Sequence, residues 1–152
     1  MSAPAAADPI RFDPRHRPLF ATAEWGVLLH RNQTHLGRCI VHLRTRAIDD
    51  PLALTAAERD ALWTEVLPRL AHGLSGAFAP DRLNYAHLAN RTHHVHWHVV
   101  PRYEAEPIRW FGGVMFRDSR PGRIFRSRKR GRVSPDVLEV IAAELVAHLP
   151  HG

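Results

Sequence analysis

Three histidines alternate with apolar residues in one short segment of the chain. Residues 92–103 read THHVHWHVVPRY, in which His94, His96 and His98 each precede an apolar side chain. A period of two is typical of a β-strand, because successive side chains of a strand point to opposite faces of the sheet. We therefore expect the apolar side chains to face the core and the three imidazoles to lie on the other face. Imidazoles can attack phosphorus, bind a metal ion or carry a proton, so this segment is the first candidate functional site.

Structural and metal-binding interpretations of the segment are both open on the residues alone. Against a purely structural function, protonated histidines that neighbour one another on a sheet face repel each other. Two histidines at spacing two can chelate zinc. The third lies about 13 Å from the first, at roughly 3.3 Å per residue, so one ion cannot reach all three. A zinc site would need further ligands, for which the candidates are His35, His42, His87 and His93.

The third interpretation is phosphoryl or nucleotidyl transfer through a histidine nucleophile. A neutral imidazole attacks phosphorus and forms a phosphohistidine, which water later cleaves. Flanking imidazoles that carry protons would offset phosphate charge and protonate the leaving oxygen. This chemistry favours His96 as the nucleophile, because His94 and His98 flank it.

The composition predicts one ordinary globular domain in a reducing compartment. The 152 residues suffice for a core without covalent staples, and the hydrophobic fraction of 45% is typical. A single cysteine, Cys39, excludes an internal disulfide and a cysteine-based zinc module. We find neither an apolar run of membrane-spanning length nor the apolar core of a signal peptide. A cytoplasmic protein without membrane contact is the expectation.

The charge balance is basic, and one segment concentrates it. The net charge is +6 with histidine neutral, which favours anionic partners such as nucleotides. The sequence RSRKRGR, Arg126–Arg132, is either a phosphate- or nucleic-acid-binding patch or a solvated loop. We prefer the solvated loop, so nucleic acid is an open partner and not the predicted one.

Hydrophobic periodicity predicts the strands that position the histidine segment. Residues 24–31 and 38–45 are expected to form a hairpin, and a further strand over residues 81–89 precedes the histidine strand. Residues 1–18, rich in Pro and Ala, are expected to be a flexible N-terminal segment. The chain after Tyr103 is polar and rich in Gly and Arg, and no further strand is expected there.

Two helices complete the predicted set of elements. Thr55 and Glu58 form a capping box at the start of the first helix, and Pro68 is expected to kink or interrupt it. Trp63 falls beside the apolar face of this helix and is expected to lie in the core. A cap at Ser134 with Pro135 after it starts the second helix. The order strand, strand, helix, strand, strand, helix predicts an α+β fold, in which helices pack against an antiparallel sheet.

The string HVHWHVV followed by Pro101-Arg102 resembles the signature of the histidine triad (HIT) superfamily, His-x-His-x-His-x-x with x apolar. The resemblance extends to the hairpin NQTHLGRCIVHLRTR, the helix start LTAAERDALW and the strand LNYAHLAN, and covers about Glu24 to Tyr103. It implies a HIT domain core over residues 19–110. The Arg-rich loop and C-terminal helix of residues 111–152 are expected to belong to the same domain.

The resemblance also implies an activity. HIT proteins are nucleotide hydrolases or transferases that act at an α-phosphate of dinucleoside polyphosphates or nucleoside phosphoramidates. They form homodimers, and the triad itself requires no cofactor or metal. Carried over by position, His96 would be the nucleophile, and His98 and His94 would contact the phosphate and assist proton transfer. Asn90 matches an asparagine that contacts the phosphate region.

Two positions depart from the family pattern. Gly37-Arg38 stands where the family usually has Gly-His, and arginine cannot relay a proton at neutral pH but can hold a phosphate. The connection before the triad is short, so Arg91 and Thr92 are expected to supply its phosphate-binding donors. Two alternatives remain open at this point. One is a nucleotide- or RNA-binding module without catalysis, and the other is a zinc enzyme with histidine ligands.

Overall fold

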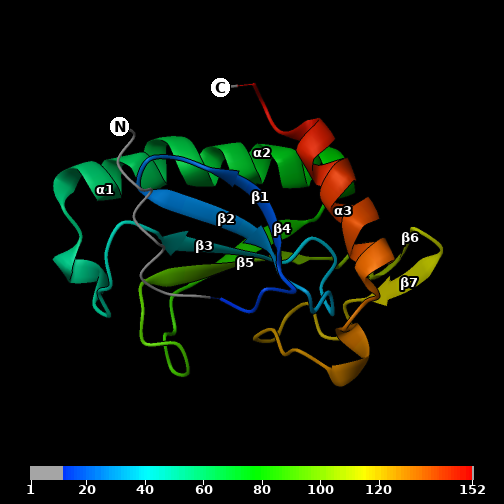
Figure 1. The fold of residues 1–152 in the computed structure, drawn as a ribbon. Helices are drawn as coiled ribbons and strands as arrows, with labels where there is room; N and C mark the ends of the chain where they lie inside the picture. Colours follow the sequence, from blue (N-terminus) through cyan, green and yellow to red (C-terminus); the bar gives the residue numbers. More distant parts are fainter. Residues whose placement is uncertain (1–11, 152) are drawn as a thin grey trace.

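Five strands form one antiparallel sheet in the computed structural model, which describes residues 12–151 (Figure 1). The strand order is β1-β2-β3-β5-β4, and every neighbouring pair is antiparallel. The strands are β1 Arg17–Ala21, β2 Trp25–Leu29, β3 Cys39–Leu43, β4 Arg82–Ala86 and β5 His96–Arg102. The predicted α+β fold with an antiparallel sheet is confirmed.

The predicted hairpin is formed by β2 and β3, whose register pairs Trp25 with Leu43 and Leu29 with Cys39. Strand β1 was not predicted, since part of it lies in the segment expected to be flexible. The sequence RPLFA is too short to show a period, and it becomes a strand by pairing with β2. Residues 1–11 of that expected flexible segment lie outside the described residues.

The first long helix begins as the capping box predicts. The Thr55 side chain accepts from the Glu58 amide at 3.1 Å, and the Glu58 carboxylate accepts from the Thr55 amide at 2.8 Å. The helix is interrupted by a wider π-helical turn, Leu62–Val66, just before Pro68. Proline has no N–H and crowds the carbonyl one turn earlier, and the wider turn accommodates both effects. The expected interruption at Pro68 is confirmed.

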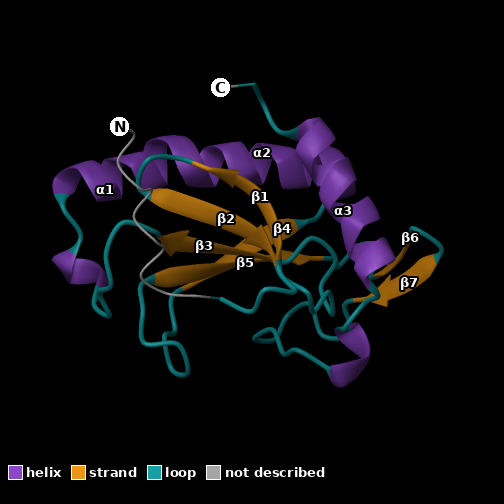
Figure 2. Cartoon of the chain, viewed as in Figure 1, coloured by secondary structure: helices purple, strands orange, loops and turns teal. Residues whose placement is uncertain are grey.

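The helices pack on one side and one end of the sheet, where the core lies. Figure 2 shows the first two helices running along one side of the sheet and the third close to the end of the second. The helical elements are η1 Pro51–Ala53, α1 Ala56–Ala61, η2 Leu62–Val66, α2 Leu67–Phe78, η3 Lys129–Gly131 and α3 Pro135–His148. The Ser134 cap of α3 is confirmed, since its side chain accepts from the Val137 amide. No helix within residues 12–151 is long and apolar enough to cross a membrane.

The apolar residues of the histidine segment face this core, as their alternation predicts. Val95 and Val99 are fully buried, and the Trp97 ring lies 5.9 Å from the Trp25 ring in an edge-on contact. We also expected Trp63 to lie in the core, and this was wrong because 57% of its surface is exposed.

A small second sheet, β6 Ile108–Phe111 with β7 Val114–Arg117, was also not predicted. Its two strands are joined by Gly112 and Gly113, which have φ values of 56° and 76°. A two-residue hairpin turn with positive φ at both positions strongly favours glycine. The Gly-Gly pair was therefore a signal for this hairpin, although its strands are only four residues long.

Candidate active site

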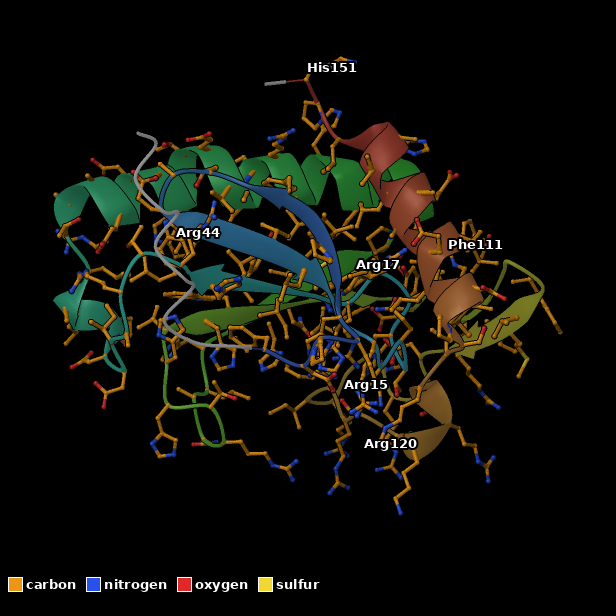
Figure 3. The ribbon with its side chains drawn as sticks, viewed as in Figure 1. Arg15, Arg17, Arg44, Phe111, Arg120 and His151 are labelled. Carbon is orange, nitrogen blue, oxygen red and sulfur yellow. The ribbon has the colours of Figure 1, made fainter. Side chains whose placement is uncertain are left out.

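A cleft of about 860 Å³ contains the second and third histidines of the triad. His96 and His98 line it, and so do four of the residues expected to bind phosphate, namely Arg38, Asn90, Arg91 and Thr92. The remaining walls come from parts of the chain that sequence reasoning did not assign to the site, among them Phe12, His16, His30, Asn32, Leu88, Ser127, Arg128, Lys129 and Arg132. Figure 3 places Arg15 and Arg120 on the side of the sheet opposite α2, where the loops around the cleft gather.

The His96 ring is held by a backbone carbonyl. Its Nδ1 lies 2.7 Å from the carbonyl oxygen of His94, and the residue is 5% exposed. A carbonyl only accepts, so Nδ1 carries the proton and Nε2 keeps an unprotonated lone pair. Burial lowers the pKa of His96 below its usual value of 6.5, which keeps the ring neutral at pH 7. A neutral imidazole with a free Nε2 has the form that a histidine nucleophile needs.

His98 is held in the opposite way. Its Nδ1 lies 3.3 Å from a guanidinium nitrogen of Arg38. Since arginine only donates, Nδ1 accepts, and the proton of the neutral ring is on Nε2. Burial and then the charge of Arg38 lower the pKa of His98 to about 3. His98 is therefore a neutral hydrogen-bond donor, and it holds no second proton to give as an acid near pH 7.

His94 does not lie in the cleft. Its side chain is fully buried, and its Nε2 lies 2.5 Å from the carbonyl oxygen of Leu43 on the neighbouring strand. The regular pairing of β5 begins at His96, so the alternation expected from the sequence does not extend back to His94. The structure thus brings two of the three imidazoles together in the cleft and places the His94 ring outside it, where our expectation had a phosphate contact.

Arg38 is the residue just before β3, and its side chain lines the cleft. Only 5% of its surface is exposed. One guanidinium nitrogen donates to the Ser127 hydroxyl, and the group lies 5.5 Å from the centre of the Phe125 ring. Burial lowers its pKa to about 10, so it stays cationic at neutral pH. Arg38 therefore brings a fixed positive charge next to His98.

Two further imidazoles, which the sequence did not single out, lie in the same wall of the cleft. The Nδ1 of His16 accepts from the Arg31 amide, and the Nδ1 of His30 accepts from the Asn32 amide. Burial lowers the pKa of His16 to about 4 and that of His30 further. Both rings are thus neutral and carry their protons on Nε2, as in His98.

The basic segment Arg126–Arg132 forms a wall of the cleft. The Arg128 carbonyl accepts from the Asn32 side chain at 2.8 Å, and the Gly131 carbonyl accepts from the Gln33 amide at 2.6 Å. The Arg128 amide in turn donates to the Thr34 hydroxyl at 2.8 Å. Our preferred interpretation as a solvated loop was therefore wrong for the backbone, although the basic side chains remain exposed.

Phe12 covers the upstream end of the cleft. Its ring centre lies 4.8 Å from that of His42 and 5.5 Å from that of His96. The residue falls in the segment expected to be flexible, and nothing in its local sequence signals the contact. An aromatic ring beside His96 adds an apolar surface on which a flat group can pack.

No metal site accompanies the histidines in the part of the chain that the structure describes. Over residues 12–151, no group of three or more His, Cys, Asp or Glu side chains has an arrangement that could hold a metal ion. His35, His42, His87 and His93 therefore do not complete a zinc site with the triad strand in this geometry.

Comparison with known proteins identifies the fold. No protein-family model and no curated protein sequence matches the chain. A histidine triad protein from Bradyrhizobium japonicum superposes with a TM-score of 0.71 at 15% identity, over 90% of this chain and 92% of that one. One from Marinobacter aquaeolei gives 0.69 at 21%, with the same coverage. One from Sinorhizobium meliloti gives 0.66 at 20%, over 91% and 96%. The chain has the fold of the histidine triad proteins, as the sequence resemblance implied.

Proposed function

We propose that this protein, which has the histidine triad fold, is a nucleotide hydrolase or nucleotidyl transferase that acts at an α-phosphate through His96. The observation that carries the proposal is the 2.7 Å contact between His96 Nδ1 and the His94 carbonyl. It leaves Nε2 of a neutral imidazole free at a cleft that cationic side chains line. The substrate class is a dinucleoside polyphosphate or a nucleoside phosphoramidate.

In the first step, Nε2 of His96 attacks the α-phosphorus and the bond to the leaving group breaks. The ring becomes a phosphorylated imidazolium that keeps its proton on Nδ1, and the His94 carbonyl stabilises this positive charge. The Nε2–H of His98 and the guanidinium of Arg38 donate to phosphoryl oxygens as negative charge develops there. Water then cleaves the nitrogen–phosphorus bond, releases the nucleoside monophosphate and regenerates neutral His96.

His94 enters this scheme as a positioning residue. Its carbonyl fixes the His96 tautomer, and its own ring is anchored on the Leu43 carbonyl. Asn90, Arg91 and Thr92 are proposed to contact the bound nucleotide, since all three line the cleft. The triad itself needs no cofactor in this scheme.

The decisive experiment compares the wild type with His96→Ala on diadenosine tetraphosphate and adenosine phosphoramidate. Both reactions are run in EDTA, stopped at short times, and analysed by intact-protein mass spectrometry and product chromatography. We expect AMP release and a trapped nucleotidyl adduct with the wild type only. EDTA has no effect if the mechanism is metal-free. Near-normal turnover by His96→Ala would refute the mechanism.

A second candidate function is nucleotide or RNA binding without catalysis. The cationic wall formed by Arg128, Lys129 and Arg132 favours it, because such a wall binds phosphates whether or not His96 reacts. A binding module would show affinity for RNA that falls steeply with salt, and it would form no covalent adduct. The same mass-spectrometry experiment therefore separates the two functions.

We also propose that the protein is a cytoplasmic homodimer. Strand β4 is an edge of the five-stranded sheet, with Tyr85 43% exposed and Leu88 just after it 46% exposed. An edge strand with exposed apolar side chains is suited to pairing with a second copy. Light scattering at several protein concentrations measures the dimer, and Tyr85→Lys is expected to shift it towards the monomer.

A further inference from the structure

A second, smaller pocket adjoins the active-site cleft. It has a volume of about 360 Å³ and shares Ser127 and Arg128 with the cleft. Besides Arg128 and the buried Arg102, three exposed arginines line it, namely Arg117, Arg120 and Arg126. Neither the triad nor the mechanism proposed above uses these three residues.

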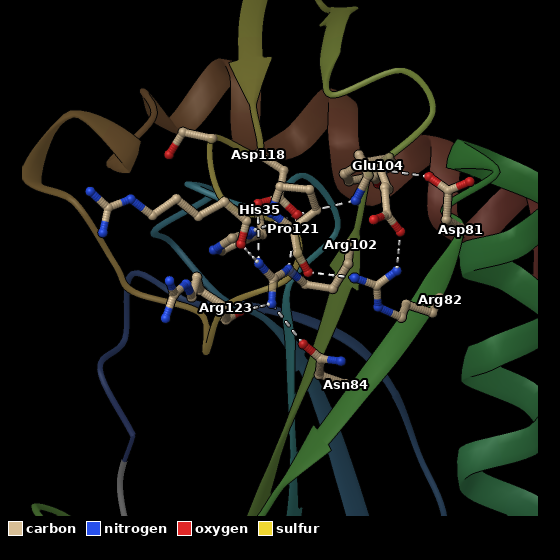
Figure 4. A network of polar contacts seen from close by, with 12 residues as sticks. His35, Asp81, Arg82, Asn84, Arg102, Glu104, Asp118, Pro121 and Arg123 are labelled. Atoms are coloured by element: carbon tan, nitrogen blue, oxygen red, sulfur yellow. Dashed lines mark hydrogen bonds and ion pairs between the residues drawn. The ribbon is translucent and has the colours of Figure 1, made fainter.

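The pocket is built on a rigid frame at the end of the triad strand (Figure 4). Arg102, the last residue of β5, is 2% exposed, and its Nε donates to the Asp118 carboxylate at 2.9 Å. The same guanidinium donates to the carbonyl oxygens of Arg120 and Arg123, each at 2.6 Å. The loop that carries the pocket arginines is therefore tied directly to the strand that carries His96 and His98.

The charge inside this frame is not neutralised by the protein. Asp118 is the one acidic residue that lines the pocket, and Arg102 already binds its carboxylate. Among the described residues, the exposed guanidinium groups of Arg117, Arg120 and Arg126 have no hydrogen-bond or ion-pair partner. Several unpaired cations around one hollow concentrate positive potential and attract an anion.

His35 also lines the pocket and packs against the same frame. It is 5% exposed, and its Nδ1 makes no hydrogen bond but lies 3.7 Å from the Asp118 carboxylate. The Asp118 carboxylate therefore faces His35 and Arg102 inside the frame and leaves the exposed arginines of the pocket unpaired. Arg128 lines both the pocket and the cleft, and its side chain donates to the hydroxyl of Ser119 in the pocket.

We propose that the pocket lined by Arg117, Arg120, Arg126 and Arg128 binds the distal phosphates of an oligophosphate leaving group while the α-phosphate lies at His96. This inference rests on the proposed function and narrows its substrate class to phosphoric anhydrides. A chain of phosphates carries negative charge at each unit, which suits cations placed at intervals along its path.

The fate of the leaving group points the same way. When a phosphoric anhydride breaks, the electron pair goes to the bridging oxygen, which departs as part of a phosphate anion and needs no proton. When a phosphoramidate breaks, the departing amine takes a proton. Neutral His98 can donate a hydrogen bond through Nε2 but has no second proton to release, because its Nδ1 accepts from Arg38. The arginine pocket would also repel a protonated amine and retain an anion.

Binding of inorganic tripolyphosphate, measured by titration calorimetry, tests the pocket without turnover. The test variant is Arg120→Ala/Arg126→Ala, in which both residues line this pocket but not the cleft. The matched control is Arg123→Ala/Arg130→Ala, which removes the same charge from exposed side chains that line neither. We expect affinity to fall by about tenfold or more in the test variant and by less than about threefold in the control. Absence of wild-type binding, or equal losses in the two variants, would overturn the proposal.

Turnover tests the leaving group. In the test variant, we expect kcat/KM for diadenosine pentaphosphate to fall by about tenfold, while that for adenosine phosphoramidate changes by less than about twofold. An equal loss on both substrates overturns the proposal but leaves the function of His96 intact. If the wild type hydrolyses neither substrate, the proposed function fails. Tripolyphosphate binding through Arg120 and Arg126 would then show that the pocket binds anions but does not hold the leaving group of a reaction at His96. The same arginines could instead bind a 5′-phosphorylated oligonucleotide more tightly than tripolyphosphate. That result would overturn the proposal, because the ligand of the pocket would then be the end of a nucleic acid.

Discussion

The two ends of strand β5 hold their side chains by opposite means. At the upstream end, backbone carbonyls hold the imidazoles, with His94 on Leu43 and His96 on His94. At the downstream end, arginine side chains hold the structure. Arg38 donates to His98, and Arg102 donates to a carboxylate and to two loop carbonyls.

This contrast gives two histidines of one strand different chemistry. A carbonyl can only accept, so His96 keeps its proton on Nδ1 and presents a lone pair on Nε2. A guanidinium can only donate, so His98 accepts at Nδ1 and presents a proton on Nε2. The type of the neighbouring group therefore separates the proposed nucleophile, His96, from a hydrogen-bond donor, His98, two residues later in the same strand.

The strongest test of this contrast makes the same substitution at both positions. Glutamine has an amide N–H that can replace the Nε2–H of His98, but it has no nucleophilic nitrogen to replace Nε2 of His96. We expect His96→Gln to lower kcat by at least about 10⁴-fold. We expect His98→Gln to lower it by only about tenfold. Steady-state kinetics on diadenosine tetraphosphate measures both, and similar losses at the two positions would contradict the assignment of the tautomers.

The next largest effect concerns the downstream anchor. Arg102→Leu would leave the Asp118 carboxylate, 3% exposed, buried without its cation. Breaking such a pair costs roughly 3–5 kcal/mol in free energy of unfolding, which urea denaturation measures. The control is Arg82→Ala, because the Arg82–Glu104 pair is exposed and is expected to contribute at most about 1 kcal/mol. A loss for Arg102→Leu no larger than that for the control would show that the loop does not depend on this anchor.

The sequence was informative where a short-range period or a cap determines the structure. The alternation predicted the strand from His96 onward and its core-facing side, and the capping box predicted where α1 begins. Trp63 shows the limit of such patterns. A residue placed on a helical face by a period of 3.6 is misplaced when a π-helical turn, Leu62–Val66, inserts an extra residue into the helix.

Contacts between distant segments could not be read from the sequence. Phe12 packs on His96, and the basic segment Arg126–Arg132 docks on residues 32–34, without any local pattern that marks either contact. The burial of His94 has the same origin, since its ring is fixed by the Leu43 carbonyl 51 residues earlier. Charge alone suggested a solvated loop for the basic segment because charge does not reveal which backbone carbonyls the rest of the chain will bind.

Replacement of Arg38 removes the guanidinium that holds His98 at the downstream end of β5. In Arg38→Ala, the phosphate loses one fixed cation, and we expect kcat to fall by about 10²-fold. The pKa of His98, about 3 in the wild type, is expected to rise because the charge of Arg38 contributes to lowering it. Kinetics and proton NMR titration of His98 measure the two effects. Arg130→Ala, which removes an exposed charge outside the cleft, is expected to change neither.

The smallest expected effect is the pH dependence of the wild type. The proposed nucleophile is neutral His96, so kcat/KM is expected to fall as pH drops through its pKa, which burial places below 6.5. His98, with a pKa of about 3, contributes no titration between about pH 5 and pH 8. On the acid side, the pH profile of kcat/KM is therefore expected to fit the protonation of one group, with a midpoint below the usual histidine range. A fit that needs two protons would mean that His98 also titrates and that Arg38 does not hold it as a neutral donor. A midpoint above 6.5 would mean that burial does not lower the pKa of His96.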